Sequence, residues 1–181
     1  LIATEKPFAK KAVDGIKKII TDAGYEVALL EKYTDKAQLL AAVADANALI
    51  IRSDKVTAEV IEAAKNLKIV VRAGAGYDNV DLAAATAKGI VVMNTPGQNS
   101  NAVAELALAM MIFMSRNRFT PGTGSELLGK TLGIHAYGHV GRLVGRKGKA
   151  LGMEVVAYDP FISDPAVFEA DGVRKVDSVE E

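Results

Sequence analysis

The chain has 181 residues, no cysteine, and equal numbers of basic and acidic side chains, 22 of each. A chain without cysteine has no disulfides and no thiolate metal sites, and this composition fits a reducing compartment, so we expect a cytoplasmic protein. The zero net charge gives no global field that would attract nucleic acid or an anionic membrane surface. The longest apolar stretch, 102–114, contains Glu105 and is shorter than the roughly 20 residues of a membrane span. We therefore expect neither nucleic acid nor a membrane as a partner.

Residues 1–96 alternate short β-branched runs with helical periods, a pattern typical of parallel βαβ units and of the α/β class. The predicted helices run from Pro7 to Gly24, over 35–43, from a cap at Thr57, and over 81–88. The predicted strands are 1–3, 25–30, 48–51, 69–71 and 90–93. We expect these residues to form a flavodoxin-like substrate-binding domain.

The run Thr95-Pro96-Gly97 interrupts this pattern, and a long helix over 101–116 follows as a linker. That helix is apolar on nearly every face, so we expect both of its sides to be covered. Strands at 131–135 and 154–158, with a helix at 140–151 between them, begin a second sheet. A dinucleotide site needs two halves of about three strands each. We therefore expect 97–181 to be the N-terminal part of a truncated, Rossmann-type nucleotide-binding domain.

The clearest binding motif lies between the strand 131–135 and the helix that follows it. It reads Ala136-Tyr137-Gly138-His139-Val140-Gly141. In such a turn, backbone amides and the positive end of the helix face a pyrophosphate, and Gly138 lacks the Cβ that would block close approach. Gly141 allows the helix to pack closely on the strand. Ala136 replaces the first glycine of the usual pattern, and because alanine holds most negative-φ conformations, we expect a modestly altered turn.

Asp159 follows the next strand, 18 residues after Gly141. A carboxylate there can accept hydrogen bonds from both ribose hydroxyls, and its charge repels a 2′-phosphate. The motif therefore predicts NAD rather than NADP as the cofactor.

A second group of candidates follows the strands of the first half. Arg52, Ser53 and Lys55 follow one strand, and Arg72 with the loop Gly74-Ala75-Gly76 follows the next. Carboxyl ends of parallel strands lie at one edge of a sheet, where open α/β sheets bind ligands. Cationic side chains beside loop amides suit a carboxylate or a phosphate. The pair Arg52 and Lys55 favours a phosphorylated substrate.

Several segments together resemble the D-2-hydroxyacid dehydrogenase family over essentially the whole chain. They are Ile51-Arg52-Ser53, 71–81, 92–96, 103–105 and 129–134. The resemblance implies an NAD-dependent oxidoreductase that moves a hydride from C2 of a small anionic 2-hydroxy acid to NAD. It is greatest to the compact branch of the family that acts on 3-phosphoglycerate, which gives 3-phosphohydroxypyruvate for serine biosynthesis. It also favours a homodimer, as does the apolar helix 101–116.

The resemblance implies roles for individual residues. Arg52, Ser53 and Arg72 would contact the substrate, and the amides of Gly74, Ala75 and Gly76 would receive its carboxylate. Ala75 would also touch the cofactor. The remaining cofactor contacts would come from Ala136, Gly138, His139, Val140, Gly141 and Asp159.

Two departures limit the resemblance. The connection 118–124 is shorter than in many members, in which extra basic residues reach the substrate of a neighbouring subunit, so that contribution is not carried over. The family's catalytic arginine, carboxylate and general acid lie beyond the matched region, so we expect no catalytic residue within 1–181.

Although histidine is the common general acid near neutral pH, His135 and His139 flank the phosphate turn, away from the nicotinamide. We interpret His135 as a packing residue, and His139 as a phosphate neighbour or a solvated turn residue.

Three further patterns favour structural interpretations. Glu105 complements the positive start of its helix. Arg142, Arg146 and Lys149 share a helical face and are expected to form a solvated stripe. Gly145 and Gly148 in the same helix predict close packing against the sheet or another subunit.

Three alternatives remain open. The substrate could be lactate, glycerate or formate instead. An NAD-sensing corepressor of the same fold would need a large exposed apolar groove on the first domain. A flavodoxin-like interaction module would leave Asp159 unexplained.

Overall fold

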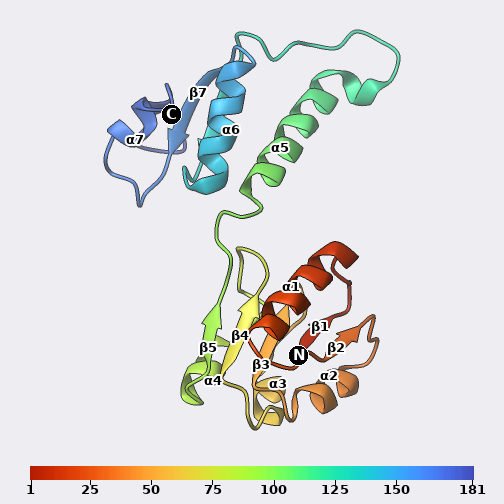
Figure 1. The fold of residues 1–181 in the computed structure, drawn as a ribbon. Helices are drawn as coiled ribbons and strands as arrows, with labels where there is room; N and C mark the ends of the chain where they lie inside the picture. The colour runs from red at the N-terminus through yellow and green to blue at the C-terminus, as the bar shows by residue number, and fades with distance from the viewer. The chain divides into compact units, whose positions relative to one another are not determined.

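A computed structural model describes residues Leu1–Glu181, which form two compact units, Leu1–Pro96 and Gly97–Glu181 (Figure 1). Both units have parallel sheets connected through helices, so the predicted α/β class is confirmed. None of the helices is long and apolar enough to cross a membrane.

The first unit contains a five-stranded sheet in the order β2-β1-β3-β4-β5, with every pair parallel. Its strands are β1 (Ile2–Thr4), β2 (Leu29–Glu31), β3 (Ala48–Ile51), β4 (Ile69–Arg72) and β5 (Val91–Met93). This is the flavodoxin-like order, in which the direction of winding reverses between β1 and β3. The reversal defines a switch point, at which the loops after β1 and β3 diverge and leave a crevice.

Four helices connect these strands: α1 (Lys10–Asp22), α2 (Lys36–Val43), α3 (Ala58–Ala63) and α4 (Leu82–Ala87). Right-handed crossovers put α1 on one face of the sheet and the other three helices on the opposite face, and α3 packs against both α2 and α4. The core of the unit contains fully or almost fully buried side chains from the strands and from this second layer, such as Val43, Leu49, Ile51, Val60 and Val70.

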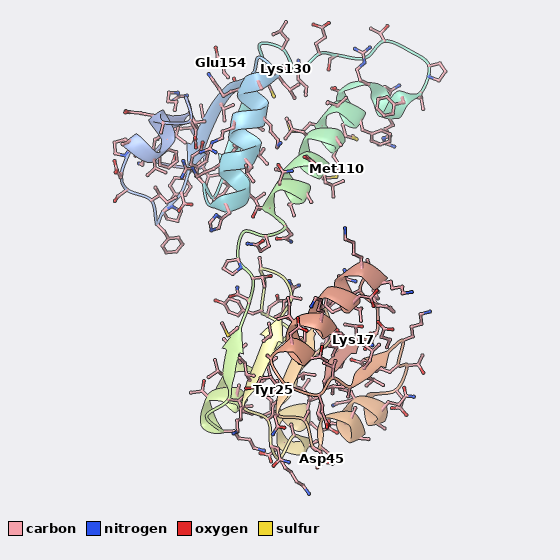
Figure 2. All side chains as sticks on the ribbon, in the orientation of Figure 1. Lys17, Tyr25, Asp45, Met110, Lys130 and Glu154 are labelled. Carbon is pink, nitrogen blue, oxygen red and sulfur yellow. The ribbon has the colours of Figure 1, made fainter.

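Two elements of the first unit are shorter than predicted. The strand expected over 25–30 is reduced to β2, because its parallel register with the three-residue β1 begins only at Leu29. Tyr25 is 71% exposed ahead of it (Figure 2). The first helix begins at Lys10 rather than near Pro7, because Arg52 binds the carbonyls of Lys6 and Pro7 and holds this segment extended.

The second unit begins with the linker helix α5 (Ser100–Ser115) and a 3-10 turn, η1 (Asn117–Phe119). A parallel sheet in the order β6-β7-β8 follows, formed by β6 (Thr131–His135), β7 (Glu154–Tyr158) and β8 (Arg174–Lys175). Its helices are α6 (His139–Ala150) and the short α7 (Ala166–Glu169). Lys130 and Glu154 lie side by side where β6 and β7 begin, and the Glu154 amide donates to the Lys130 carbonyl at 3.0 Å (Figure 2).

The sequence predicts two strands in this unit, at 131–135 and 154–158, whereas the structure has a third, β8. β8 pairs with β7 through Arg174 and Lys175. This strand is not predictable from the sequence pattern, because it is two residues long and both residues are charged, whereas runs of β-branched residues indicate the other strands.

Glycine allows α6 to pack closely on its own sheet, as predicted. A Cβ at Gly148 would lie 2.8 Å from Leu132 Cδ2, and one at Gly145 would lie 3.2 Å from the Tyr137 ring. Helix α5 packs against α6 but buries only Ser100, Ala104 and Leu108. The expectation that both sides of α5 are covered is therefore wrong within this chain.

Asp54 connects the two sides of the switch point in the first unit. Its buried carboxylate accepts hydrogen bonds from the Glu5 amide (2.7 Å), the Tyr33 hydroxyl (2.8 Å) and the Arg52 amide (3.2 Å). Burial and the neighbouring Asp54 raise the pKa of Tyr33, so its hydroxyl stays a donor. The side-chain amide of Asn79 binds the carbonyls of Arg52 and Asp54 at 3.2 and 2.8 Å. This network fixes the chain that leaves β3 and carries Ser53.

We expect Asp54→Ala to destabilise the first unit by about 2–4 kcal/mol, because three donors lose a buried charged acceptor. Tyr33→Phe, which removes one donor, should cost about 1–2 kcal/mol. Denaturant titration measures both values. Asp22→Ala is the control, because its ion pair with Lys18 is exposed and should contribute less than about 0.5 kcal/mol. Equal losses in Asp54→Ala and Asp22→Ala would contradict the role given to Asp54.

Candidate functional site

The first unit has a cavity of about 680 Å³ at the carboxyl ends of β3 and β4. It is lined by Ser53, Lys55, Val56, Thr57, Arg72, Asp78, Asn79, Val80 and Asp81. Three buried polar atoms here have no hydrogen-bond partner: Arg72 Nε, Thr57 Oγ1 and Asn79 Oδ1. Such atoms are costly to bury and are normally satisfied by a ligand, a water or a neighbour. The cavity therefore offers two donors, Arg72 and Thr57, close to the lysine.

The Thr57 side chain does not cap its helix in the way expected from the sequence. It is the N-cap residue of α3, as predicted, but its hydroxyl makes no capping hydrogen bond. Neither Thr57 nor Asn79 was singled out as a site residue from the sequence, because a threonine before a helix usually indicates a cap alone.

Arg52 lies apart from the other predicted substrate residues. Its guanidinium donates to the Lys6 carbonyl at 3.2 Å and the Pro7 carbonyl at 3.0 Å, and it stacks over the Phe8 ring at 5.3 Å. The structure thus brings Ser53 and Arg72 together in the cavity, while Arg52 holds the segment between β1 and α1. The chain bends at Arg52 and Ser53, directly after β3 ends at Ile51, and the two side chains go to different surroundings.

The loop Gly74-Ala75-Gly76 is fixed by its neighbours. The Asn94 side chain donates to the Ala75 carbonyl at 2.7 Å, and the Thr95 amide donates to the Gly74 carbonyl at 2.9 Å. A Cβ at Gly74 would lie 1.3 Å from Arg72 Nη1, so only glycine allows the guanidinium to lie there. The Gly74 amide already donates to the Arg72 carbonyl. The amides of Ala75 and Gly76 therefore remain as donors for a ligand.

In the second unit, the turn between β6 and α6 is built around one close approach. A Cβ at Gly141 would lie 2.2 Å from the Ala136 carbonyl oxygen, so the helix can meet the turn only at a glycine. Ala136 has φ +80°, in the left-handed region that favours glycine. The expectation of a negative φ at Ala136 is wrong, because the Ala136 amide is bound to the Tyr158 carbonyl and its own carbonyl must point at Gly141.

The other predicted cofactor residues surround this turn. Gly138 is the N-cap of α6, and a Cβ there would meet no atom within 4 Å. His139 begins the helix, is exposed, and lies 3.7 Å from where Gly97 would carry a Cβ. Val140 follows it within the same helix. His135 ends β6 with its ring tilted against Tyr158 at 5.7 Å, but the residue is exposed, so it packs on one side only.

Asp159 is bound directly to the turn. Its Oδ2 accepts from the Tyr137 amide at 2.7 Å and its Oδ1 from the Phe161 amide at 2.9 Å. These two bonds fix the carboxylate beside the N-terminus of α6, at the carboxyl end of β7.

Arg142 and Arg146 do not form the solvated stripe that their spacing predicts. Their Nε atoms donate to the two oxygens of Asp171 at 2.9 and 2.6 Å, and the Tyr137 hydroxyl adds a third bond at 3.1 Å. Asp171 is only 3% exposed at its side chain, which is why two partly exposed arginines bend toward it. Nothing in the local sequence links Asp171 to residues about 30 positions earlier, so this contact is not predictable from the sequence pattern.

The charges in this cluster are fixed over a wide pH range. Burial of Asp171 by itself raises its pKa, but the bonds from Arg142, Arg146 and Tyr137 outweigh burial and hold the pKa below its ordinary value of 3.8. Burial and Asp171 raise the pKa of Tyr137 to about 12. Since the folded-state pKa of Asp171 is lowered, the stabilisation it provides is present above the ordinary pKa and is lost as the pH falls through the lowered value.

We expect Gly141→Ala to destabilise the second unit by more than about 2 kcal/mol, because the added methyl group clashes with backbone that cannot move away cheaply. Ala136→Gly should instead stabilise it by about 0.5–1 kcal/mol, since glycine relieves the strained φ but gains more freedom in the unfolded chain. Denaturant titration checks both. Gly138→Ala is the control and should change stability by less than about 1 kcal/mol. A neutral Gly141→Ala would contradict the close approach.

Comparison with known proteins gives the context for these two sites. A family model described as "D-isomer specific 2-hydroxyacid dehydrogenase, catalytic domain" matches residues 3–173. The chain is 45% identical over 175 residues to D-3-phosphoglycerate dehydrogenase of Rattus norvegicus, which covers 88% of this chain and 32% of that protein. It is 42% identical over 149 residues to hydroxypyruvate reductase of Thermotoga maritima, which covers 75% of this chain and 49% of that protein.

A solved structure shares the fold. The NAD+-bound 3-phosphoglycerate dehydrogenase of Entamoeba histolytica aligns with a TM-score of 0.86 at 48% identity, over 93% of this chain and 59% of that one. The chain therefore spans about a third to somewhat over half of these relatives. The family match over 3–173, together with these relatives, shows that the chain belongs to the D-isomer specific 2-hydroxyacid dehydrogenase family.

Proposed function

We propose that the protein carrying this chain is a cytoplasmic, NAD-dependent dehydrogenase that oxidises 3-phosphoglycerate to 3-phosphohydroxypyruvate in serine biosynthesis. Residues 1–96 would bind the substrate and 97–181 the adenosine and pyrophosphate part of NAD. The observation that carries the proposal is the Asp159 carboxylate, bound to the glycine-rich turn beside the N-terminus of α6.

The second unit fits a dinucleotide. The open space at Gly138 leaves room for a phosphate at the start of a 12-residue helix, whose positive end favours an anion. The Entamoeba relative, at 48% identity, was solved with NAD+ bound. Each Asp159 oxygen already accepts one amide and retains a lone pair for a ribose hydroxyl. When bound, NAD would supply the hydride acceptor, while Gly138, His139 and Val140 would hold its pyrophosphate.

Asp159→Asn in the full-length protein tests the cofactor assignment. We expect the Kd of NADH to rise about 10-fold and the preference for NADH over NADPH to fall at least 10-fold. The reason is that the asparagine amide neither accepts hydrogen bonds from both ribose hydroxyls nor repels a 2′-phosphate. Each tenfold change corresponds to about 1.4 kcal/mol. Fluorescence titration measures both constants. Asp164→Asn, a change of the same kind in the following loop, should leave both constants unchanged. An unaltered preference in Asp159→Asn would exclude the ribose role.

The first unit suits an anionic hydroxy acid. The cavity holds Ser53, Lys55 and Arg72, with Arg72 Nε and Thr57 Oγ1 buried and unpartnered. Ala75 and Gly76 supply amides suited to a carboxylate, and Ala75 would also meet the cofactor. Two relatives named for 3-phosphoglycerate, at 45% and 48% identity, support a phosphorylated substrate. Arg52 would contribute through the guanidinium nitrogens that it does not use on Lys6 and Pro7.

Arg72→Ala should raise the KM for 3-phosphoglycerate about 10- to 100-fold and change the KM for NAD less than about 3-fold, because a charge-assisted contact is worth about 1.5–3 kcal/mol. Arg72→Lys separates charge from geometry and should fall between the wild type and alanine. Lys65→Ala, an exposed cation elsewhere in the unit, is the control. If KM rose equally for both substrates, the anion site would not be at Arg72.

The exposed apolar side chains of α5 support the proposal that the protein is a homodimer. Leu106, Met110 and Met114 are 59%, 53% and 58% exposed on this helix, and Figure 2 labels Met110. These residues recur at i, i+4 and i+8 and so form one apolar stripe. Contiguous apolar surface of this kind is characteristic of protein interfaces.

The double variant Leu106→Lys/Met110→Lys should shift the full-length protein from dimer to monomer in light scattering at micromolar concentration, because two buried lysines per subunit would face their symmetry copies. Ile19→Lys, which replaces a 72% exposed apolar residue on α1, should leave the dimer intact. A dimer that survives the double variant would place the interface elsewhere.

A further inference from the structure

We propose that Tyr137, Asp171, Arg142 and Arg146 form an anchor that holds Asp159 and the phosphate turn in the geometry required by the adenosine half of the dinucleotide. The proposal rests on the NAD site proposed above and assigns a function to four side chains that would not themselves touch the cofactor. They would act as positioning residues.

Tyr137 is held at both ends. Its amide donates to Asp159 Oδ2 at 2.7 Å, and its hydroxyl donates to Asp171 Oδ2 at 3.1 Å. The ring between them is fully buried and stacks on Phe168, with the centroids 4.7 Å apart and the planes 16° from parallel. A residue fixed by its backbone, its ring and its hydroxyl cannot rotate without breaking one of these contacts. Tyr137 therefore transmits the position of Asp171 to Asp159.

Asp171 in turn is held in place by two arginines of α6. Arg142 and Arg146 lie one turn apart on α6 and bind different oxygens of the carboxylate, at 2.9 and 2.6 Å. The carboxylate is in the segment between α7 and β8, so these bonds join that segment to the helix whose N-terminus faces the proposed pyrophosphate. With the hydroxyl of Tyr137, Asp171 receives three donors and is satisfied despite its burial.

The turn needs such an anchor because Ala136, the residue before Tyr137, has a strained backbone conformation. Ala136 has φ +80°, a conformation that costs an L-residue free energy and persists only where surrounding contacts enforce it. Tyr137 is the next residue along the chain. If its hydroxyl lost Asp171, the peptide between Ala136 and Tyr137 could relax, and the Tyr137 amide would leave Asp159. The carboxylate would then lose the bond that orients it toward the ribose.

Packing alone does not require this arrangement. A phenylalanine at 137 would fill the same space and stack on Phe168 in the same way, without the cost of burying a hydroxyl against a carboxylate. The hydroxyl, the carboxylate and the two arginines thus add orientation to a contact that the aromatic rings already make.

The test is Tyr137→Phe in the full-length protein, with Kd values measured by fluorescence titration at 25 °C. We expect the Kd of NADH to rise about 5- to 10-fold and the preference for NADH over NADPH to fall. The Kd of reduced nicotinamide mononucleotide, which lacks the adenosine, should stay unchanged. Asp171→Asn should have a similar effect, and the double variant should be no worse than the stronger single variant, because both changes break one chain of contacts.

Val155→Ala is the matched control, because it removes buried volume from the core cluster that also contains the Tyr137 ring, but removes none of the hydrogen bonds of the anchor. It should lower the Tm while leaving the Kd of NADH unchanged. If Tyr137→Phe and Asp171→Asn also lowered only the Tm, the anchor would be structural and the proposal overturned. If Tyr137→Phe did not fold, Asp171→Asn alone would decide between these outcomes. A wild-type protein that bound no NADH would overturn the NAD site and the anchor together, whereas normal NADH binding by both variants would overturn the anchor alone.

Discussion

The close approach of α6 to the end of β6 determines the geometry of the second unit. With no room for a Cβ at Gly141, the first turn of the helix lies against the Ala136 carbonyl, and Ala136 is forced into a left-handed conformation. Gly138 then caps the helix with free space in front of it. The Tyr137 amide, turned by the same peptide, meets the carboxylate of Asp159. One steric constraint thus brings together a helix N-terminus, a feature that commonly binds anions, and a fixed carboxylate.

The first unit reaches a comparable arrangement by a different means. Its strand order reverses between β1 and β3, and the buried carboxylate of Asp54 joins the chains that leave these two strands. Arg52 reinforces this join by binding carbonyls of the segment before α1, while Ser53 and Arg72 line the cavity. In both units, a carboxylate that accepts backbone amides orders a loop at the carboxyl ends of parallel strands, where α/β proteins bind their ligands.

The sequence predicted those features that depend on local pattern. Periodicity and spacing predict the strands at 48–51 and 131–135, the turn 136–141 and the carboxylate of Asp159. The family resemblance then assigned these separate features to one kind of protein. Features that depend on contacts between distant parts of the chain were either not predicted or predicted wrongly. The partners of Arg142 and Arg146 lie at Asp171, β8 has too few residues to show a pattern, and the length of β2 is set by its partner β1. The φ of Ala136 reflects the close approach of its carbonyl to Gly141, five positions later, which no residue propensity describes.

Our central proposal is that residues 97–181 hold part of NAD and residues 1–96 hold a phosphorylated 2-hydroxy acid, in a protein that transfers a hydride between them. It is tested most directly by following NADH absorbance at 25 °C as the full-length protein is offered 3-phosphohydroxypyruvate or pyruvate, each with NADH or NADPH. We expect rapid oxidation of NADH with the phosphorylated acid. The rates with pyruvate or with NADPH should be at least about 10-fold lower, which corresponds to a difference of about 1.4 kcal/mol in activation free energy. A protein that binds NADH tightly and reduces neither acid would contradict this proposal and would favour a dinucleotide-sensing corepressor.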